Sequence, residues 1–264
     1  MAFRGFPGVE QAFDPALSGL ERAFVRLLGA PQNGLRIRLR HVLPETRGDY
    51  ADILDAGSGP GVFSMEVAKL HPHARVLGVE LEPELVERAN TIASRAGIAN
   101  CRFTRGDVTA LGMEESFDLA LTVDILEHVE EDEEAMRNLH RALRPGGRLV
   151  VHVPGYHRRW LLRGKRVNFH VPGHVRPGYH RDELVAKLER AGFQVERVRS
   201  TYGTLETFTN NLSWLITGAE KRNRHLYALA FPILLGLSWL GRGARPEWGA
   251  GLLAVARRPP REGP

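Results

Sequence analysis

The stretch Ile53-Leu-Asp-Ala-Gly-Ser-Gly-Pro-Gly-Val-Phe-Ser64 joins a short apolar run to a glycine-rich turn, after which a helical pattern begins. Its first part, within Ala51–Asp55, is typical of the end of a buried parallel strand. The three glycines of the turn can adopt positive φ and let a ligand approach the backbone closely. A helix that starts near Val62 points its free N–H groups toward that ligand. The stretch therefore predicts a strand, turn and helix unit that binds a ligand at its turn.

Strand and helix patterns alternate from this unit to about residue 154. After Ala51–Asp55, the expected strands are Arg75–Leu81, Cys101–Asp107, Phe117–Val123 and Gly147–Pro154. The expected helices are Val62–Leu70, Glu84–Ala96 and Glu131–Leu143. This alternation predicts a mostly parallel sheet with helices on both faces, and such sheets bind ligands at the carboxyl ends of their strands.

The remaining segments predict a cap, three further elements and an insertion. The further elements are a helix and two strands, Asp182–Ala191, Phe193–Arg199 and Gly251–Arg257. Residues 1–50 are expected to form a helical cap, within which Leu35–Leu43 fits helix and strand equally well. The α/β domain then comprises residues 51–203 and 249–259, and residues 204–248 form an apolar helical insertion.

Composition sets only broad limits on function. The 264 residues are 43% hydrophobic and 25% charged, which is ordinary for a soluble globular protein. The single cysteine, Cys101, fits a reducing compartment, and Met1–Leu20 lacks the apolar core of a secretory signal, so a cytoplasmic location is expected. The net charge of +5 is compatible with nucleic acid, an anionic membrane surface or an acidic substrate as partner.

The glycine turn differs from the two common phosphate-binding turns. A dinucleotide-binding turn needs a third glycine where Val62 stands, and a P-loop needs a Gly-Lys-Ser/Thr sequence that this turn lacks. Acidic residues instead lie at the ends of three successive expected strands, at Asp55, Glu80 and Asp107. Three carboxylates would repel a pyrophosphate, but they suit a ribose diol, an exocyclic amine and a cationic centre. Each also has a structural alternative, in which it caps a turn or the following helix.

At these residues the chain resembles the class I S-adenosylmethionine (SAM)-dependent methyltransferases. Asp55-Ala-Gly-Ser-Gly-Pro-Gly61, Gly106-Asp-Val108, Phe117-Asp-Leu-Ala-Leu-Thr-Val123 and Leu143-Arg-Pro-Gly-Gly-Arg-Leu-Val150 match family motifs in order and spacing. The resemblance implies a Rossmann-like sheet of seven strands, with SAM as cofactor. It implies that SAM is bound by Asp55, Gly57, Ser58, Gly59, Gly61, Glu80, Leu81, Gly106, Asp107, Val108, Val123 and Asp124.

Two later segments resemble the branch of this family that acts on small-molecule and lipid-like acceptors, including quinone-biosynthesis methyltransferases. They are Leu126-Glu-His-Val129 and Arg176-Pro-Gly-Tyr-His180. His128 follows the fourth strand and is the candidate general base, with a SAM-shaping or helix-capping role as the alternative. We expect acceptor contacts from His170, His174, Arg176 and Tyr179. No metal is expected, because the histidine spacing matches no standard zinc pattern.

The insertion contains an uncharged stretch, Leu226–Leu240, which is interrupted by Pro232 and is shorter than the roughly 18–20 residues of a membrane-spanning helix. Basic residues and amphipathic aromatics flank it, so residues 221–245 fit an anionic membrane interface, with a helical lid or a dimer face as alternatives. Either arrangement gives the site an apolar roof and favours a lipophilic acceptor.

Two other functions stay open at this point, a nucleic-acid methyltransferase and a non-catalytic SAM-binding protein. Against the first, the fourth strand ends in Thr122-Val-Asp-Ile125 rather than in the Asn/Asp-Pro-Pro-aromatic sequence of amino-methylating enzymes, so nucleic acid is disfavoured as partner. The sequence leaves open whether oxygen, nitrogen or carbon is methylated, and also the oligomeric state.

Overall fold

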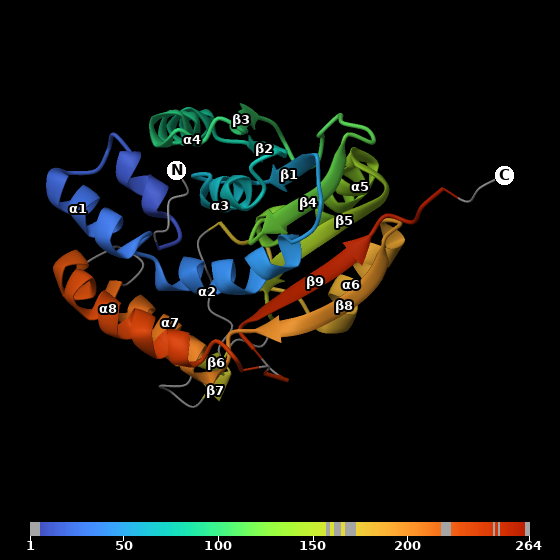
Figure 1. The fold of residues 1–264 in the computed structure, drawn as a ribbon. Coiled ribbons are helices and arrows are strands. Elements are labelled where there is room, and N and C mark those ends of the chain that lie inside the picture. Colours follow the sequence, from blue (N-terminus) through green and yellow to red (C-terminus); the bar gives the residue numbers. More distant parts are fainter. Residues whose placement is uncertain are drawn as a thin grey trace.

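The computed structural model describes residues 6–156, 159–160, 165–166, 173–217, 223–244, 246–247 and 249–261. A seven-stranded sheet in the order β3-β2-β1-β4-β5-β9-β8 runs through the molecule (Figure 1). Its strands are β1 (Asp52–Ala56), β2 (Arg75–Glu80), β3 (Cys101–Arg105), β4 (Phe117–Val123), β5 (Leu143–Pro154), β8 (Gln194–Thr201) and β9 (Gly251–Arg257). β9 pairs antiparallel with both β5 and β8, and the other neighbouring strands of this sheet pair in parallel. This confirms the predicted Rossmann-like α/β fold class.

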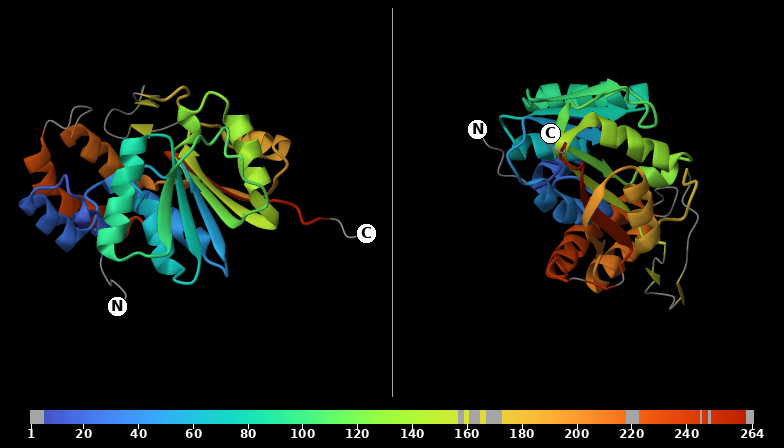
Figure 2. Two further views of the ribbon diagram at one scale, coloured as in Figure 1. Left: turned by 90° about the horizontal axis from the view of Figure 1, so that it is seen from above. Right: turned by 90° about the vertical axis from the view of Figure 1, so that its right-hand side faces the viewer.

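Helices cover both faces of this sheet, as Figure 2 shows. One face carries α2 (Asn33–Val42), α3 (Val62–Leu70) and α4 (Pro83–Ala96), and the other carries α5 (Asp132–Ala142) and α6 (Arg181–Arg190). Adjacent β1 residues pack into opposite cores, Ile53 on the α2 and α3 side and Leu54 on the α5 and α6 side. Because side chains alternate along a strand, a strand buried on both faces has a continuous apolar sequence.

Several predicted boundaries change in the structure, most of them by one or two residues. β1 begins and ends one residue later than expected, and β3 ends at Arg105, so Asp107 lies beyond the strand. β5 begins at Leu143 rather than at Gly147, because Leu143 already pairs with Phe117 before the register shifts. The intervening Arg-Pro-Gly-Gly sequence therefore lies within the strand's bounds rather than before them.

The ambiguous segment 35–43 is mostly helical, because residues 35–42 make up most of α2. Leu35, Leu39 and Val42 lie four and three residues apart, and all three are buried against the sheet in the same core. The intervening arginines reach other elements, since Arg38 pairs with Asp124 and Arg40 pairs with Glu206. The arginines therefore do not form one solvent-facing side of α2, which is why the alternating sequence also fitted a strand.

The other N-terminal elements are η1 (Val9–Phe13), α1 (Gly19–Leu28) and η2 (Leu43–Thr46), and the insertion forms α7 (Thr204–Thr217) and α8 (Arg224–Leu240). Helices α1, α7 and α8 gather at the end of the molecule that lies away from the C-terminus (Figure 1). The rings of Phe24 on α1 and Phe231 on α8 are 5.9 Å apart, and the Tyr227 hydroxyl of α8 accepts a hydrogen bond from the Asn33 N–H. The N-terminal segment and the insertion therefore pack together, although almost 200 residues separate them.

Two further features concern chain segments outside the main sheet. A short antiparallel pair, β6 (Arg159–Trp160) and β7 (Lys165–Arg166), was not predicted from the sequence. Among the described residues, no helix is both long enough and apolar enough to cross a membrane.

Candidate functional site

The glycine turn between β1 and α3 has the backbone conformation that its sequence predicts. Gly57, Gly59 and Gly61 have φ of 80°, 52° and 80°, which side-chain-bearing residues rarely adopt. A Cβ at Gly57 would lie 2.4 Å from Ile125, whereas a Cβ at Gly59 would meet no atom within 4 Å. Gly57 is thus required by close packing, and Gly59 leaves open space next to the backbone. The turn is fixed to β2, because the N–H groups of Gly57 and Ser58 both donate to the Val79 carbonyl.

Glu80, the last residue of β2, joins the turn to the start of α4. One carboxylate oxygen accepts the Gly59 N–H at 2.7 Å, and the other accepts the N–H groups of Leu81 at 2.8 Å and Glu82 at 3.1 Å. Glu80 therefore bonds to N–H groups before the first turn of α4, as the capping alternative predicted, and it also lies at the position expected to bind the ligand. A carboxylate in this position holds the turn and is also placed to accept hydrogen bonds from a bound diol.

Asp55 is the buried acid of the site. Its carboxylate accepts a hydrogen bond of 2.5 Å from the Ser64 hydroxyl on α3. Burial raises the pKa of Asp55 to about 7, and the nearby Glu80 carboxylate adds to the increase, while the bonds from Ser64 oppose it. Near neutral pH this group therefore changes charge easily, and a cation bound beside it would favour the ionised form.

Asp107 and its neighbours follow β3. The Gly106 N–H donates to the Glu80 carbonyl at 2.9 Å, which brings this segment beside the end of β2. One Asp107 oxygen, Oδ1, accepts hydrogen bonds from both the N–H and the hydroxyl of Thr109. Asp107 therefore closes a local turn, which was the structural alternative to ligand binding. Val108 packs into the core below. Asp55 and Glu80 thus lie in the last two residues of β1 and β2, and Asp107 lies two residues after β3, so the three carboxylates belong to the carboxyl ends of three neighbouring strands.

Asp124, directly after β4, is held in a network that sequence reasoning missed. It has a φ of 54°, unusual for a residue with a side chain. Its carboxylate binds Arg38 of α2 at 2.6 Å and His152 of β5 at 2.6 Å, and the other His152 nitrogen lies 3.0 Å from the Thr201 hydroxyl. Burial lowers the pKa of His152, although Asp124 opposes this shift. His152 is thus a neutral ring that donates to Asp124 and accepts from Thr201.

Two of the predicted acceptor-side histidines come together. His128 lies in η3 (Leu126–His128), with its Nδ1 2.9 Å from the Gly173 carbonyl. The His174 ring meets the His128 ring edge to face, with centroids 4.5 Å apart. His170 lies outside the described residues. The structure thus places residues 45 or more positions apart in the sequence at one edge of the sheet.

Arg176 and Tyr179 fasten the 173–180 segment to η3. Arg176 donates to the carbonyls of Leu126 and Val129, and the Tyr179 hydroxyl lies within hydrogen-bond distance of Leu126 and of the Asp132 carboxylate. Tyr179 is only 1% exposed, and burial raises the pKa of its phenol. These contacts do not support the expected role of Tyr179 and Arg176 in binding the acceptor. They support a role in positioning the segment that carries His174.

Replacing Tyr179 with phenylalanine tests this positioning role. We expect the free energy of unfolding to fall by about 1–3 kcal/mol, because Asp132 loses a buried hydrogen-bond donor. SAM affinity should change less than twofold, because the Tyr179 hydroxyl bonds to Leu126 and Asp132 and not to the residues expected to bind SAM. Urea unfolding and calorimetry measure the two quantities. A large loss of SAM affinity at unchanged stability would instead indicate direct contact with a ligand.

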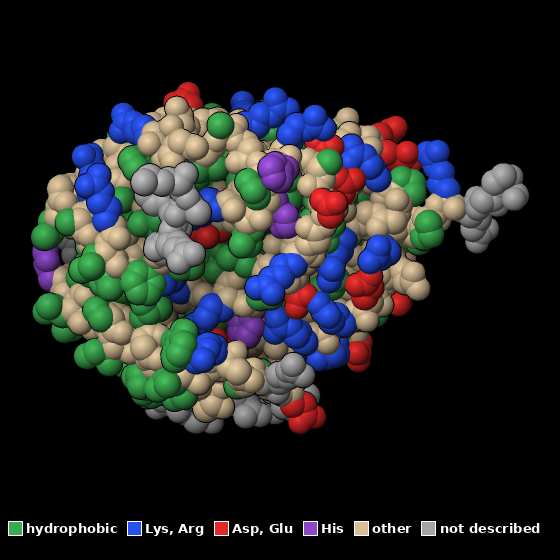
Figure 3. All heavy atoms as spheres, in the orientation of Figure 1, with side chains coloured by type: hydrophobic (Ala, Val, Ile, Leu, Met, Phe, Trp, Pro, Cys, Tyr) green, Lys and Arg blue, Asp and Glu red, His purple; other side chains and the backbone are tan. Residues whose placement is uncertain are grey.

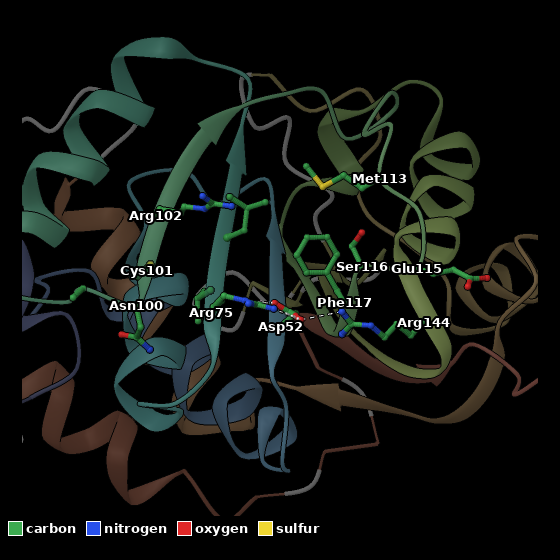
Figure 4. Close-up of a pocket in the computed structure, with 13 residues that line it drawn as sticks. Asp52, Arg75, Asn100, Cys101, Arg102, Met113, Glu115, Ser116, Phe117 and Arg144 are labelled. Carbon is green, nitrogen blue, oxygen red and sulfur yellow. Dashed lines mark hydrogen bonds and ion pairs between the residues drawn. The ribbon is translucent and has the colours of Figure 1, made fainter.

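A cleft of about 730 Å³ lies at the opposite edge, at the amino ends of the strands. In Figure 4, Asp52 lies between Arg75 and Arg144, with dashed lines to both. Asp52 binds Arg75 at 2.7 Å and Arg144 at 2.9 Å, and Arg144 also binds Asp118 at 2.6 Å. Because these charged side chains pair with one another, we interpret them as a structural ion-pair network that lines the cleft and not as a ligand site. The candidate site remains at the carboxyl ends of the strands.

The residues at that edge fit SAM. The open backbone at Gly59 allows close approach, and the carboxylates of Glu80, Asp107 and Asp55 suit a ribose, an adenine amine and the positively charged methionine portion. Ile125 closes the turn from the β4 side.

Comparisons with known proteins agree with this geometry. Residues 49–190 match the family model described as a methyltransferase domain. Over 177 residues the chain is 30% identical to a ubiquinone biosynthesis O-methyltransferase of Xanthomonas axonopodis pv. citri, a match that covers 61% of this chain and 70% of that protein. It is 32% identical over 119 residues to a trans-aconitate 2-methyltransferase of Deinococcus radiodurans. This match covers 45% of this chain and 43% of that protein.

A solved structure matches over a larger share of the chain. The S-adenosylmethionine dependent methyltransferase from Mesorhizobium loti is 25% identical, with a TM-score of 0.55, and the match covers 87% of this chain and 99% of that one. The chain spans less than half the length of several curated relatives, including the one from Deinococcus. The family model covers more than half of this chain, and it confirms the family and the methyl donor that the motifs predicted. The chain belongs to the class I SAM-dependent methyltransferases.

Proposed function

We propose that this protein transfers the methyl group of SAM to a small lipophilic acceptor, which it takes from a membrane surface. Bound SAM supplies a methyl group that its sulfonium has already activated. The protein's part is then to hold the donor and acceptor in line and to keep water out. In this proposal the glycine turn, Glu80, Asp107 and Asp55 bind the donor, and His128 and His174 lie on the acceptor side.

The observation that carries the lipophilic acceptor is an apolar face on the insertion and the N-terminal helix. We define this apolar face as the exposed side chains of Leu20 and Leu27 on α1 and of Leu226, Leu229, Ile233, Trp239 and Leu240 on α8. Leu229 is 78% exposed and Ile233 is 66% exposed. Hydrophobic side chains gather over this end of the molecule in Figure 3. Contiguous exposed apolar patches commonly mark interaction sites.

Helix α8 has two different apolar sides, which explains why its sequence fitted both a lid and a membrane contact. Phe231 and Leu234 are buried, and the Ser238 hydroxyl on the same side accepts a hydrogen bond from Arg40 at 2.7 Å. This side is packed as a lid would be. The opposite side carries Leu229 and Ile233 and remains exposed.

The surroundings of the apolar face favour an anionic lipid surface as its partner. Arg26 on α1 is exposed, and the Arg242 guanidinium lies 3.3 Å above the Trp239 ring. A tryptophan beside an arginine suits the boundary between acyl chains and head groups. Other basic residues expected to contribute, Lys221, Arg222 and Arg245, lie outside the described residues.

The named relatives leave the acceptor open, since one bears the name of a ubiquinone-pathway enzyme and another that of a trans-aconitate methyltransferase. The proposal for a lipophilic acceptor therefore rests on the apolar face. A protein that binds a membrane by this face would collect an acceptor dissolved in the bilayer without carrying it through water.

The double substitution Leu229→Glu with Ile233→Glu tests the proposal. We expect the wild-type protein to sediment with vesicles containing phosphatidylglycerol, and the variant to partition at least about tenfold less. The reason is that two apolar side chains, each worth about 1.5–3 kcal/mol when fully buried, are replaced by charges that the anionic surface repels. Circular dichroism checks that both proteins are folded.

Leu70→Glu is the matched control, because Leu70 is 49% exposed at the end of α3 and lies outside the apolar face. It should sediment like the wild type. With labelled SAM and a total lipid extract as acceptor, the label should move to the organic phase. Equal sedimentation of the wild type and the double variant, or a label that stays in water, would count against the proposal.

A further inference from the structure

Three side chains lie close enough together to bind one metal ion, although the family resemblance did not predict a metal site. They are Glu127 and His128 of η3 and His174 of the 173–180 segment, and one ligand atom from each lies within 4.8 Å of the other two. We propose that Glu127, His128 and His174 bind a divalent metal ion on the acceptor side of the SAM site. Two histidines and one carboxylate are a common donor set for such ions.

The spacing of the three atoms is close to what a bound ion needs. Metal bonds to imidazole and carboxylate are about 2.1 Å long, so two ligands of one ion are at most roughly 4.2 Å apart. The difference is at most roughly 0.6 Å, which a small shift of the exposed His128 side chain closes. The three donors leave coordination positions open, as in metal sites that bind a substrate or water.

The backbone already holds the three residues together without an ion. The Val175 N–H donates to the Glu127 carbonyl at 2.9 Å, and Arg176 donates to the Leu126 carbonyl at 2.6 Å. These hydrogen bonds therefore join the two segments next to the cluster. Sequence spacing did not reveal it, because the donors come from two segments 46 residues apart and include a glutamate rather than a cysteine.

His128 is oriented as metal-binding histidines usually are. The Gly173 carbonyl can only accept a hydrogen bond, so in a neutral His128 ring the proton lies on Nδ1, 2.9 Å away, and the lone pair is on Nε2. A hydrogen bond from one ring nitrogen to a carbonyl fixes the tautomer and increases the basicity of the other nitrogen, which binds the metal. Glu127 is 1% exposed, so the attraction between its carboxylate and a cation would be weakly screened.

The cluster also lies beside the donor site. Ile125, which closes the glycine turn at Gly57, is two residues before Glu127. A cation at the cluster would bind an oxygen of the acceptor in one of its open positions; this step rests on the proposed function. The assignment gives His128 a role different from the general base expected from sequence, since its Nε2 would hold the ion. It also replaces the expectation that no metal is bound.

Cobalt(II) is a suitable probe, because its visible absorption reports the coordinating ligands. The full-length protein is freed of metal with a chelator and titrated with Co²⁺ in the absence of SAM and acceptor, so the result is independent of methyl transfer. We expect one Co²⁺ per chain, with affinity at least about tenfold lower in Glu127→Gln and in His174→Ala. His73→Ala, which removes an exposed histidine after α3, should bind like the wild type.

Thermal unfolding without metal shows whether the variants are folded. If Glu127→Gln does not fold, His128→Ala, at an exposed position, takes its place and should show the same loss. Absence of saturable one-to-one binding by the wild type, or unchanged Co²⁺ affinity in the folded variants, would overturn the proposal.

Discussion

Replacing Glu80 with glutamine is expected to weaken SAM binding by about 100-fold. The two Glu80 oxygens accept three backbone N–H groups, from Gly59, Leu81 and Glu82. A glutamine amide has one oxygen and one NH₂ group, so at least one of these donors would face another donor. A ribose diol bound at Glu80 would also lose its charged acceptor, at a turn that Glu80 no longer holds in shape. One hydrogen bond to a charged group contributes about 1.5–3 kcal/mol, which corresponds to roughly this change in affinity.

Calorimetry with SAM and with S-adenosylhomocysteine measures the effect, and both affinities should fall. Glu82→Gln is the matched control, because Glu82 is exposed and contributes only its backbone N–H to Glu80. It should bind SAM like the wild type. NADH should bind to neither protein. An affinity of Glu80→Gln within threefold of the wild type would show that the carboxylate does not hold the donor site.

The elements that position Glu80 could be predicted from sequence because their signals are local. Apolar runs, helical periods and the glycines of residues 57–61 placed β1, α3 and β2 to within a residue. The family motifs implied a Rossmann-like sheet of seven strands, whereas the order of the strands became known only from the structure. Predicted boundaries were wrong where a tertiary contact sets them. Leu143 was expected to end a helix, but it pairs with Phe117 and so begins β5 four residues before the predicted start at Gly147.

The parts of the site that sequence missed depend on contacts between distant segments. Arg38 and His152 meet Asp124 from elements 86 and 28 residues away, and no periodicity encodes such a meeting. The same holds for His174 beside His128. For Tyr179, the residue type suggested chemistry, but its 1% exposure and its bonds to Leu126 and Asp132 became visible only in three dimensions.

Replacing Asp55 with asparagine is expected to have opposite effects on stability and on SAM binding. Burial raises the pKa of Asp55 to about 7, from an ordinary value near 3.8. Between these two pH values the folded protein keeps a proton that the unfolded chain has released, so its free energy of unfolding falls as pH rises, by about 1.4 kcal/mol per unit. Asparagine removes this cost. Urea unfolding of the unliganded proteins should therefore show the stability of Asp55→Asn increasing relative to the wild type as the pH rises from about 5 to about 7, with no further increase well above pH 7.

The same substitution should weaken SAM binding at least about tenfold at pH 8, because the positively charged donor favours the ionised carboxylate. For the same reason, wild-type binding at pH 7 should release part of a proton, seen as different calorimetric enthalpies in phosphate and Tris buffers. Ser64→Ala is the informative companion, since it removes the 2.5 Å hydrogen bond that lowers the Asp55 pKa. It should move the pH dependence of binding to higher pH, whereas Asp55→Asn should abolish it. Equal enthalpies in the two buffers for the wild type would mean that Asp55 does not change charge when the donor binds.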